Sequence, residues 1–316
     1  MPKNSWNSLG LYASGETEFG KFLINTGLRF DNFWINTEET DGYVDDDDNP
    51  LPTEDEHYSS VNGSLGAVYA LGSGVNLVTN IGSAYRVPNV VERFYFGSAS
   101  NRETRPNPDI KPERSISLDF GVKAVHDEVN YSLIGFYSDY SDFTQLQNFD
   151  SIPAPGPPGA YTPLWRYENI DDVTIYGFEG VVEANFHSGV YGSLSFTYQH
   201  GQNDTEDEPL FVSPVKTSAT AGYRHKKHGL FGEVTVRKIE DQGRVPNVTY
   251  LDDIATKGFA VVDVTAGVTL FSSVKLAVVG KNLFDEVYAE PFNARNPDNP
   301  VPEAGRGLVV SINAGI

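Results

Sequence analysis

The chain has 316 residues, enough for one large β-domain or for two domains. Acidic residues outnumber basic residues 43 to 23, and the resulting net charge of −20 argues against nucleic acid as a partner. The absence of cysteine excludes disulfides and thiolate metal sites. With 17 Tyr, 19 Phe and 30 Gly but only 39% hydrophobic residues, the composition suits strands that have one apolar and one polar face.

Period-two alternation predicts thirteen strands. In chain order they cover residues 6–18, 21–37, 58–70, 75–86, 114–125, 129–147, 165–186, 190–199, 214–225, 230–239, 258–270, 274–284 and 306–316. A tight turn at Phe19-Gly20 joins the first two strands, and a segment with five prolines, IPAPGPPGAYTP (152–163), is expected to contain no strand. No run approaches the roughly 18 apolar residues of a transmembrane helix.

Two features of these strands favour a membrane barrel over a soluble sandwich or propeller. Many strands reach about ten residues, whereas strands of soluble sheets usually have five or six. The connections alternate strictly between very short turns and long polar loops, which is typical of an outer-membrane β-barrel. The alternating positions then give one lipid-facing and one lumen-facing row, for example Ile116, Leu118, Phe120, Val122 and Ala124 against Ser115, Ser117, Asp119, Gly121 and Lys123. We therefore predict an all-β, antiparallel transmembrane barrel, here a partial barrel of about 13 strands.

A series of short motifs resembles the TonB-dependent outer-membrane receptors. Tyr85-Arg86-Val87-Pro88, Glu92-Arg93-Phe94 and the segment from Asn107 to Glu113 are similar to the FRAP and NPNLKPE boxes of that family. Further matches, in the order of the family, are GLRFD (27–31), YGFE (176–179), NLFD (282–285) with Tyr288, and Gly305-Arg306. The motif residues expected to have structural roles are Gly27, Arg29, Asp31, Pro88, Asn107, Pro108, Pro112, Glu113, Gly177, Glu179, Asn282, Leu283, Phe284, Gly305 and Arg306.

The resemblance implies a barrel of roughly 22 strands with a plugged lumen, an N-terminal plug domain and a TonB box that contacts the TonB complex. We therefore expect residues 1–316 to be the C-terminal part of such a barrel domain, with the plug and signal peptide lying outside it. Thirteen strands alone would form a curved open sheet with two unpaired edges. The final Ile316 departs from the terminal aromatic residue of the family.

The candidate ligand-binding residues lie in loops and at loop bases. Arg86, Glu92 and Arg93 could contact an anionic ligand or the plug, or could only form salt bridges between neighbouring strands and loops. Aromatic rings could stack on an aromatic siderophore or simply belong to an interfacial girdle. These aromatic candidates are Phe94, Tyr95, Tyr161 and Trp165.

No metal, cofactor or enzyme site is predicted. Asp45–Asp48 lacks the glycine of a calcium loop and is read as a solvated loop, and Glu179 and Glu183 as part of a wet barrel wall. The segment from Arg86 to Ile110 contains no histidine, so the axial haem ligand of haem receptors is absent there. The chain has no HExxH, GxSxG or phosphate-loop motif.

The predicted function is that of a receptor in the outer membrane of a Gram-negative cell, in contact with outer-membrane lipid. It would import a scarce nutrient, most often a ferric siderophore in this family, with energy delivered through the TonB complex. Two alternatives stay open: a passive porin or barrel adhesin, and a soluble β-rich secreted binding protein. The sequence does not identify the substrate.

Overall fold

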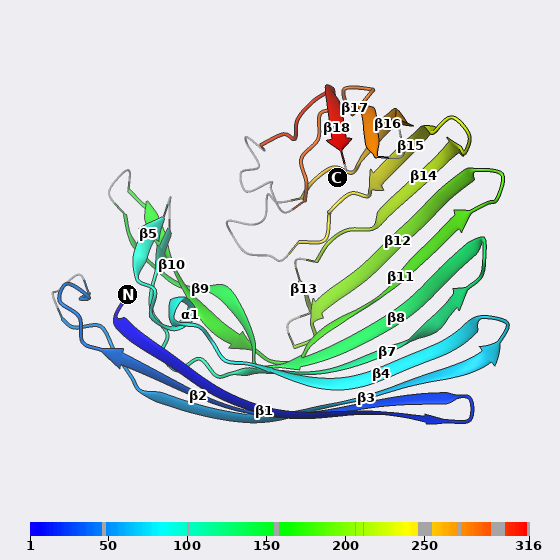
Figure 1. Ribbon diagram of the computed structural model, residues 1–316. Helices are drawn as coiled ribbons and strands as arrows, with labels where there is room; N and C mark the ends of the chain where they lie inside the picture. Colours follow the sequence, from blue (N-terminus) through cyan, green and yellow to red (C-terminus); the bar gives the residue numbers. More distant parts are fainter. Residues whose placement is uncertain are drawn as a thin grey trace.

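The computed structural model describes all residues except 46–48, 100–101, 155–157, 206, 211, 246–254, 271–272, 292–300 and 315–316. Its main feature is a curved antiparallel sheet whose strands lie side by side in the order in which they occur along the chain (Figure 1). Along the sheet these strands are β1 (Lys3–Phe19), β2 (Phe22–Glu38), β3 (Glu56–Gly72), β4 (Val75–Arg86), β7 (Glu113–Val125), β8 (Val129–Ser141), β11 (Val173–Asn185), β12 (Val190–Asn203), β14 (Lys216–His225), β15 (Leu230–Ile239), β16 (Phe259–Leu270), β17 (Val274–Lys281) and β18 (Gly307–Ala314).

The long connections contain further elements. A short helix, α1, and four strands lie between β4 and β11, two of them with only three residues, and β13 pairs with β12. Their bounds are α1 (Val90–Phe94), β5 (Gly97–Ala99), β6 (Arg102–Thr104), β9 (Phe143–Pro153), β10 (Tyr161–Ile170) and β13 (Glu208–Pro209).

The predicted alternation of faces is confirmed. One face, which we call the outer face, carries large exposed apolar side chains. The opposite, inner face carries hydrogen-bonded polar pairs between neighbouring strands, such as Ser117–Ser138 (Oγ–Oγ 2.8 Å) and Thr220–Thr235 (Oγ1–Oγ1 2.9 Å). An exposed apolar face of this extent suits lipid rather than water. It includes Leu28, Phe30, Val61, Leu65, Ile81, Ile116, Leu118, Phe120, Tyr176, Phe178, Leu194, Val234, Val236, Val278, Leu308 and Val310.

Large inner-face side chains pack over glycines on adjacent strands. A Cβ on Gly177 would lie 2.1 Å from the Tyr198 carbonyl oxygen and 2.8 Å from the Phe136 ring. The Tyr191 ring covers Gly222 in the same way, at 2.4 Å from the position of a Cβ. Glycine at these positions lets neighbouring strands and an aromatic ring approach closely.

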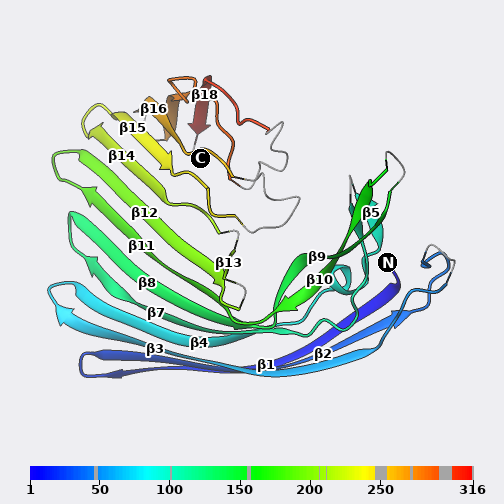
Figure 2. The same cartoon turned by 180° about the vertical axis from the view of Figure 1, so that it is seen from behind.

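All short connections lie at one end of the sheet and all long connections at the other, as predicted (Figures 1 and 2). This arrangement separates charge. The six long connections between the strands of the main sheet contain 29 acidic and nine basic residues, whereas the remaining residues contain 14 of each. The whole net charge of −20 therefore belongs to the end with the long connections.

The sheet is open, as expected for thirteen strands. Among the described residues, β1 pairs only with β2 and β18 only with β17, and these edge strands lie apart in both views (Figures 1 and 2). Both edge strands run toward the end with the short turns. Within the described residues, no helix has the length and apolar character needed to cross a membrane, a finding that says nothing about a β-barrel.

The structure corrects three details of the predicted elements. The predicted strands 129–147 and 165–186 each break at an aspartate with φ of 55°, Asp142 and Asp172, so that β9 and β10 separate from β8 and β11. Aspartate tolerates this left-handed conformation, which ends the ladder. Strand structure also enters both ends of the proline segment 152–163, since Pro153 ends β9 and Pro163 lies in β10. The first turn is Gly20-Lys21, because Phe19 pairs with Phe22 and Gly20 has a φ of 60°.

Candidate ligand-binding rim

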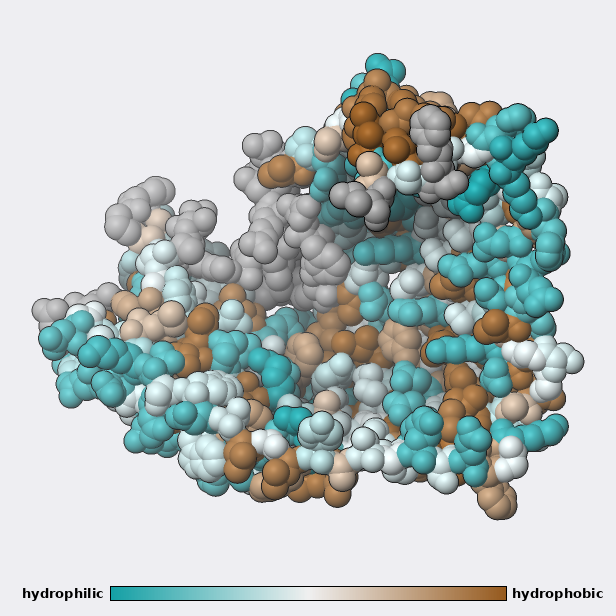
Figure 3. Space-filling model, viewed as in Figure 1, coloured by the Kyte–Doolittle hydropathy of each residue, from teal (hydrophilic) through white to brown (hydrophobic). Residues whose placement is uncertain are grey.

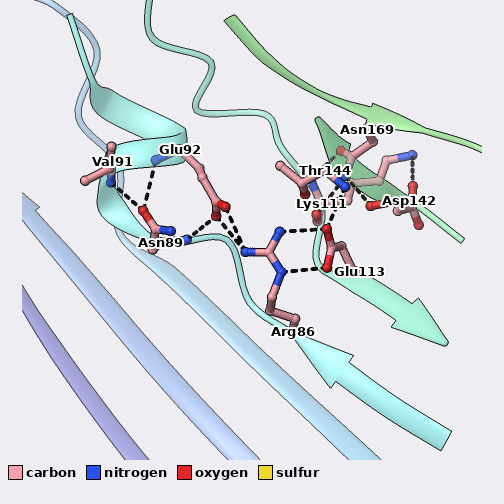
Figure 4. A network of polar contacts seen from close by, with 9 residues as sticks. All are labelled: Arg86, Asn89, Val91, Glu92, Lys111, Glu113, Asp142, Thr144 and Asn169. Atoms are coloured by element: carbon pink, nitrogen blue, oxygen red, sulfur yellow. Dashed lines mark hydrogen bonds and ion pairs between the residues drawn. The ribbon is translucent and has the colours of Figure 1, made fainter. Parts of the chain in front are cut away.

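The two predicted boxes meet where β4 ends and β7 begins. Arg86 lies directly opposite Glu113 in this strand pair, and its Nε and Nη2 donate to the two carboxylate oxygens at 2.5 and 2.6 Å. The backbone N–H of Thr144, in the connection after β8, donates to the same carboxylate at 2.6 Å (Figure 4). The Glu113 carboxylate therefore ties the start of the next connection, at Thr144, to the sheet.

Glu92 links this ion pair to helix α1. Its carboxylate accepts from Arg86 Nη1 at 2.8 and 2.9 Å and from the backbone N–H of Asn89 at 2.8 Å (Figure 4). The Asn89 side chain accepts in return from the backbone N–H groups of Val91 and Glu92, completing a capping box. The cap fixes the direction in which the chain leaves β4.

The side chain of Arg93, the residue after Glu92, is fully buried. Its Nε and Nη2 donate to the Pro108 carbonyl at 3.1 and 2.7 Å, and Nη2 also donates to Glu56 at 3.0 Å. Phe94 is equally buried, and its carbonyl accepts from the hydroxyl of Tyr43, in the first long connection. Burial of this hydroxyl raises the pKa of Tyr43 to about 12.

The third long connection docks on the same place. Asn107 Nδ2 donates to the Tyr167 carbonyl at 2.8 Å, and the Asn169 side chain makes hydrogen bonds to both backbone groups of Lys111. We call Arg86, Glu92, Arg93, Asn107, Pro108 and Glu113 the rim hub. Through it, three connections that are distant in sequence are held together.

Beyond the rim hub, two connections build a small folded unit. Strands β5, β6, β10 and β9 form a four-stranded sheet in which β6 runs parallel to β10, and we call this sheet the loop lobe. Trp165 is fully buried in it, whereas Tyr161 is 62% exposed. The Arg166 guanidinium lies over the Phe149 ring at 4.4 Å, and both side chains reach solvent. The lobe thus offers exposed aromatic surface on a fixed support.

The predicted ligand residues divide by exposure. Arg93, Phe94 and Trp165 are buried, and Glu92 is mostly covered by its partners. By contrast, 42% of the Arg86 side chain is exposed, and Tyr95 is half-buried near Gly97. Their roles in ligand binding stay predictions, but the structure gives the buried residues, and the ion-paired Arg86 and Glu92, a definite role in holding the rim.

Several predicted motif residues make structural contacts elsewhere in the sheet. Arg29 forms a bidentate pair with Asp31 at 2.7 Å for both bonds, beside the close-packed Gly27. Asn282 is buried with a φ of 45°, and its side chain bonds both backbone groups of the turn at Glu286. The remaining motif positions are Pro88, which is buried; Pro112, just before β7; Glu179, exposed on the inner face; Leu283, whose N–H donates to Val262; Phe284, which is exposed; and Gly305 and Arg306, which adjoin the Asp285 carboxylate.

One cluster on the inner face was not predicted from the sequence. Arg237 forms an ion pair with Glu290, while its guanidinium lies over the rings of Phe259 and Tyr288. The Tyr288 and Phe259 rings pack with their centroids 4.1 Å apart and their planes tilted by 32°, next to Ile239. The last long connection therefore folds against β15 and β16. The alternation of residues in β15 and β16 was the only signal in the sequence, and it does not indicate that Arg237 pairs with a residue of a loop.

Within the described residues, no group of three His, Asp or Glu side chains is placed to hold a metal ion. Asp45 bonds Asn49, and residues 46–48 of the predicted acidic run lie outside the described residues, as does Ile316. His126, His187, His225 and His228 lie at or beside short turns, while His57 and His200 lie in strands toward the opposite end. Hydrogen bonds from the His187 backbone and imidazole lower the pKa of Glu128.

A family model described as "TonB dependent receptor-like, beta-barrel" matches residues 2–283. Among curated proteins, the vitamin B12 transporter BtuB of Photobacterium profundum is 26% identical over 266 residues, covering 81% of this chain and 38% of that protein. The ferric enterobactin receptor of Pseudomonas aeruginosa is 25% identical over 168 residues, covering 49% of this chain and 22% of that protein. The chain thus spans well under half the length of these relatives.

Solved structures show the same fold. The copper transporter OprC superposes with a TM-score of 0.82 at 20% identity, covering 98% of this chain and 48% of that chain. The siderophore receptor PirA from Acinetobacter baumannii gives a TM-score of 0.69 at 18% identity, covering 98% of this chain and 55% of that chain. These relatives are named as transporters or receptors, and their titles name several different cargoes.

Proposed function

Because the chain belongs to the TonB-dependent receptor family, through its β-barrel domain, we propose that it acts in an outer-membrane receptor that imports a scarce nutrient. A ferric siderophore is the ligand class we propose, by analogy with two of the relatives above. Energy would come from the TonB complex, which would act through a part of the receptor outside these residues. Outer-membrane lipid would surround the apolar outer face.

The observation that best supports ligand capture is the loop lobe. Two long connections form a sheet there, and the rim hub holds its base through the Arg86–Glu113 pair. We propose that the exposed Tyr161 and the Phe149–Arg166 pair make the first contact with ligand, since aromatic rings on a rigid support lose little conformational freedom on binding. Arg93, Phe94 and Trp165 would support this surface from below.

The charge of the long connections supports a further restriction on the ligand. A net charge of −20 on one end of the molecule attracts cations and slows the approach of anions, an effect that salt screens. We therefore propose a ferric complex that is neutral or positively charged. Uptake of a cationic complex should slow as ionic strength rises, whereas uptake of an anionic complex should accelerate.

Uptake of ⁵⁵Fe tests the proposal. Cells with the intact gene, a deletion strain, and cells lacking TonB would be given a panel of ferric siderophores under iron limitation. We expect one or more complexes to enter only when both the receptor and TonB are present. Uptake that persists without TonB would instead support the passive porin, and the absence of uptake of any complex would contradict iron import.

Variants of the loop lobe test the capture surface. Tyr161→Ala and Phe149→Ala should raise the ligand concentration that gives half-maximal uptake, with the maximal rate retained. Phe284→Ala is the matched control, because Phe284 is also exposed but lies in the last long connection. Equal effects of all three substitutions would contradict a specific role for the lobe.

A further inference from the structure

The turn between β14 and β15 carries an unusual run of basic side chains. The run consists of Arg224 and His225, the last two residues of β14, followed by Lys226, Lys227 and His228 in the turn. The other five short turns together contain one lysine, Lys21, and two isolated histidines, His126 and His187, so a run of consecutive basic residues occurs at this turn alone. A feature confined to one turn of six is not a general property of this end of the sheet, so the turn calls for its own explanation.

The turn is rigidly held. The N–H of Gly229 donates to the His225 carbonyl at 3.0 Å, and the N–H of Thr269 in β16 donates to the Gly229 carbonyl at 2.9 Å. Gly229 has a φ of 63°, and a Cβ there would lie 2.4 Å from the Thr269 carbonyl oxygen. The two imidazole rings lie 4.7 Å apart, with the His228 N–H donating to His225 Nδ1. Lys226 and Lys227 are therefore displayed to solvent from a fixed backbone.

The turn begins next to the lipid-facing surface. Tyr223 and Leu230, on the outer face of β14 and β15, are both about half exposed, and Tyr223 pairs with the apolar Val190 of β12. A tyrosine at the edge of an apolar band is typical of the level of lipid headgroups. Figure 3 shows hydrophilic surface at the ends of these strands, beside the apolar residues. Arg224 points away from this surface and lies over the inner-face Tyr191 ring at 5.1 Å.

The positive charge of the turn is not neutralised by neighbouring carboxylates. Among the ion pairs of the described residues, none includes Lys226 or Lys227. The adjacent turn at 186–189 contains no acidic residue, nor does the turn at 271–273. Glu233, three residues beyond Leu230 at the start of β15, accepts from the Tyr191 hydroxyl on the inner face.

We propose that the turn His225–His228 binds the phosphate headgroups of anionic phospholipids in the leaflet next to the short turns. Lysine ammonium groups are strongly hydrated point charges that suit a phosphate at the membrane surface. A metal ion is a poorer fit, because two ammonium groups repel it and His225 Nδ1 already accepts a hydrogen bond. The inference requires the membrane-spanning barrel and does not depend on the imported ligand.

Native mass spectrometry of the purified protein during titration with phosphatidylglycerol tests this proposal. Lys226→Gln combined with Lys227→Gln should weaken phosphatidylglycerol binding roughly 25-fold, at about fivefold per lysine near the membrane surface. The matched control combines Lys123→Gln with Lys281→Gln, which removes the same charge from the inner face. The control should change binding less than twofold, and neither pair should change binding of zwitterionic phosphatidylcholine.

Three results would overturn the proposal. The first is unchanged phosphatidylglycerol binding in the turn variant, and the second is an equal loss in the control, which would indicate a non-specific effect of net charge. The third is micromolar binding of Zn²⁺ that His225→Gln abolishes, together with lipid binding that the lysine variant leaves intact. That third result would make the turn a metal site.

Discussion

Substituting Glu113 tests whether the rim hub is an energetic unit. Glu113→Gln removes a carboxylate that accepts three hydrogen bonds, two from Arg86 and one from the Thr144 backbone. Hydrogen bonds to charged groups contribute about 1.5–3 kcal/mol, and the 42% exposure of the Arg86 side chain reduces the value for this site. We expect a loss of about 2 kcal/mol in the free energy of unfolding.

Removing the cation should cost more than removing one carboxylate. Arg86→Met leaves Glu92 and Glu113 close together without a shared partner, and we expect a loss of about 3 kcal/mol. In the double variant Arg86→Met/Glu113→Gln, the methionine faces a neutral glutamine, so the repulsion between the carboxylates of Glu92 and Glu113 is removed. The double variant should therefore be about as unstable as Arg86→Met alone, which gives a coupling energy of about 2 kcal/mol.

The assay is urea unfolding of the purified protein in detergent micelles, followed by tryptophan fluorescence, with hydrogen exchange of the peptide spanning residues 87–95 as a local measurement. The exposed Lys238–Glu240 pair provides a control, since Glu240→Gln should change stability by less than about 0.5 kcal/mol. A coupling energy below about 0.5 kcal/mol between Arg86 and Glu113 would refute the argument that the hub acts as a unit.

Three other substitutions test neighbouring features. Tyr43→Phe should lower the free energy of unfolding by about 1 kcal/mol, because the buried Phe94 carbonyl loses its donor. The wild type alone should lose that stability as the pH rises from 10, the ordinary tyrosine pKa, to about 12. If the stability of both proteins falls equally over this pH range, the hydrogen bond does not stabilise the fold. Gly177→Ala should cost about 3 kcal/mol in urea unfolding because its Cβ has no space, whereas Gly180→Ala, with its nearest atom at 3.5 Å, should be well tolerated. Arg93→Met should lower stability by about 3 kcal/mol and increase proteinase K cleavage between residues 87 and 112; unchanged cleavage would mean that the buried guanidinium does not hold this connection.

The strands were predictable from the sequence because one face must meet lipid and the other polar surroundings. Ile116, Leu118 and Phe120 alternate with polar residues for this reason, and the predicted faces agree with the structure. The long connections have no such requirement. There, Asp142 and Asp172 interrupt runs that read as continuous strand, since nothing in a period-two pattern marks a left-handed residue.

The candidate site was only partly predictable for a similar reason. The pairing of Arg86 with an acidic neighbour was one of the two interpretations offered by the sequence, and cross-strand register explains it. Arg93 is buried with Glu56 and Pro108 as its partners, and the adjacent Phe94 carbonyl accepts from Tyr43; these partners come from other segments of the chain. Contacts of this kind depend on how loops meet in space, which residue spacing does not encode.

We propose that the long connections face the cell exterior and that the short turns lie on the opposite side of the outer membrane. Residues 1–316 contain no cysteine, so a cysteine introduced at a single position within them can be labelled with a membrane-impermeant maleimide. Tyr161→Cys in the loop lobe and Ser188→Cys in a short turn are both at exposed positions. We predict that intact cells label only Tyr161→Cys, and that Ser188→Cys reacts after the outer membrane is permeabilised. Labelling of both variants in intact cells, or of neither, would contradict this topology.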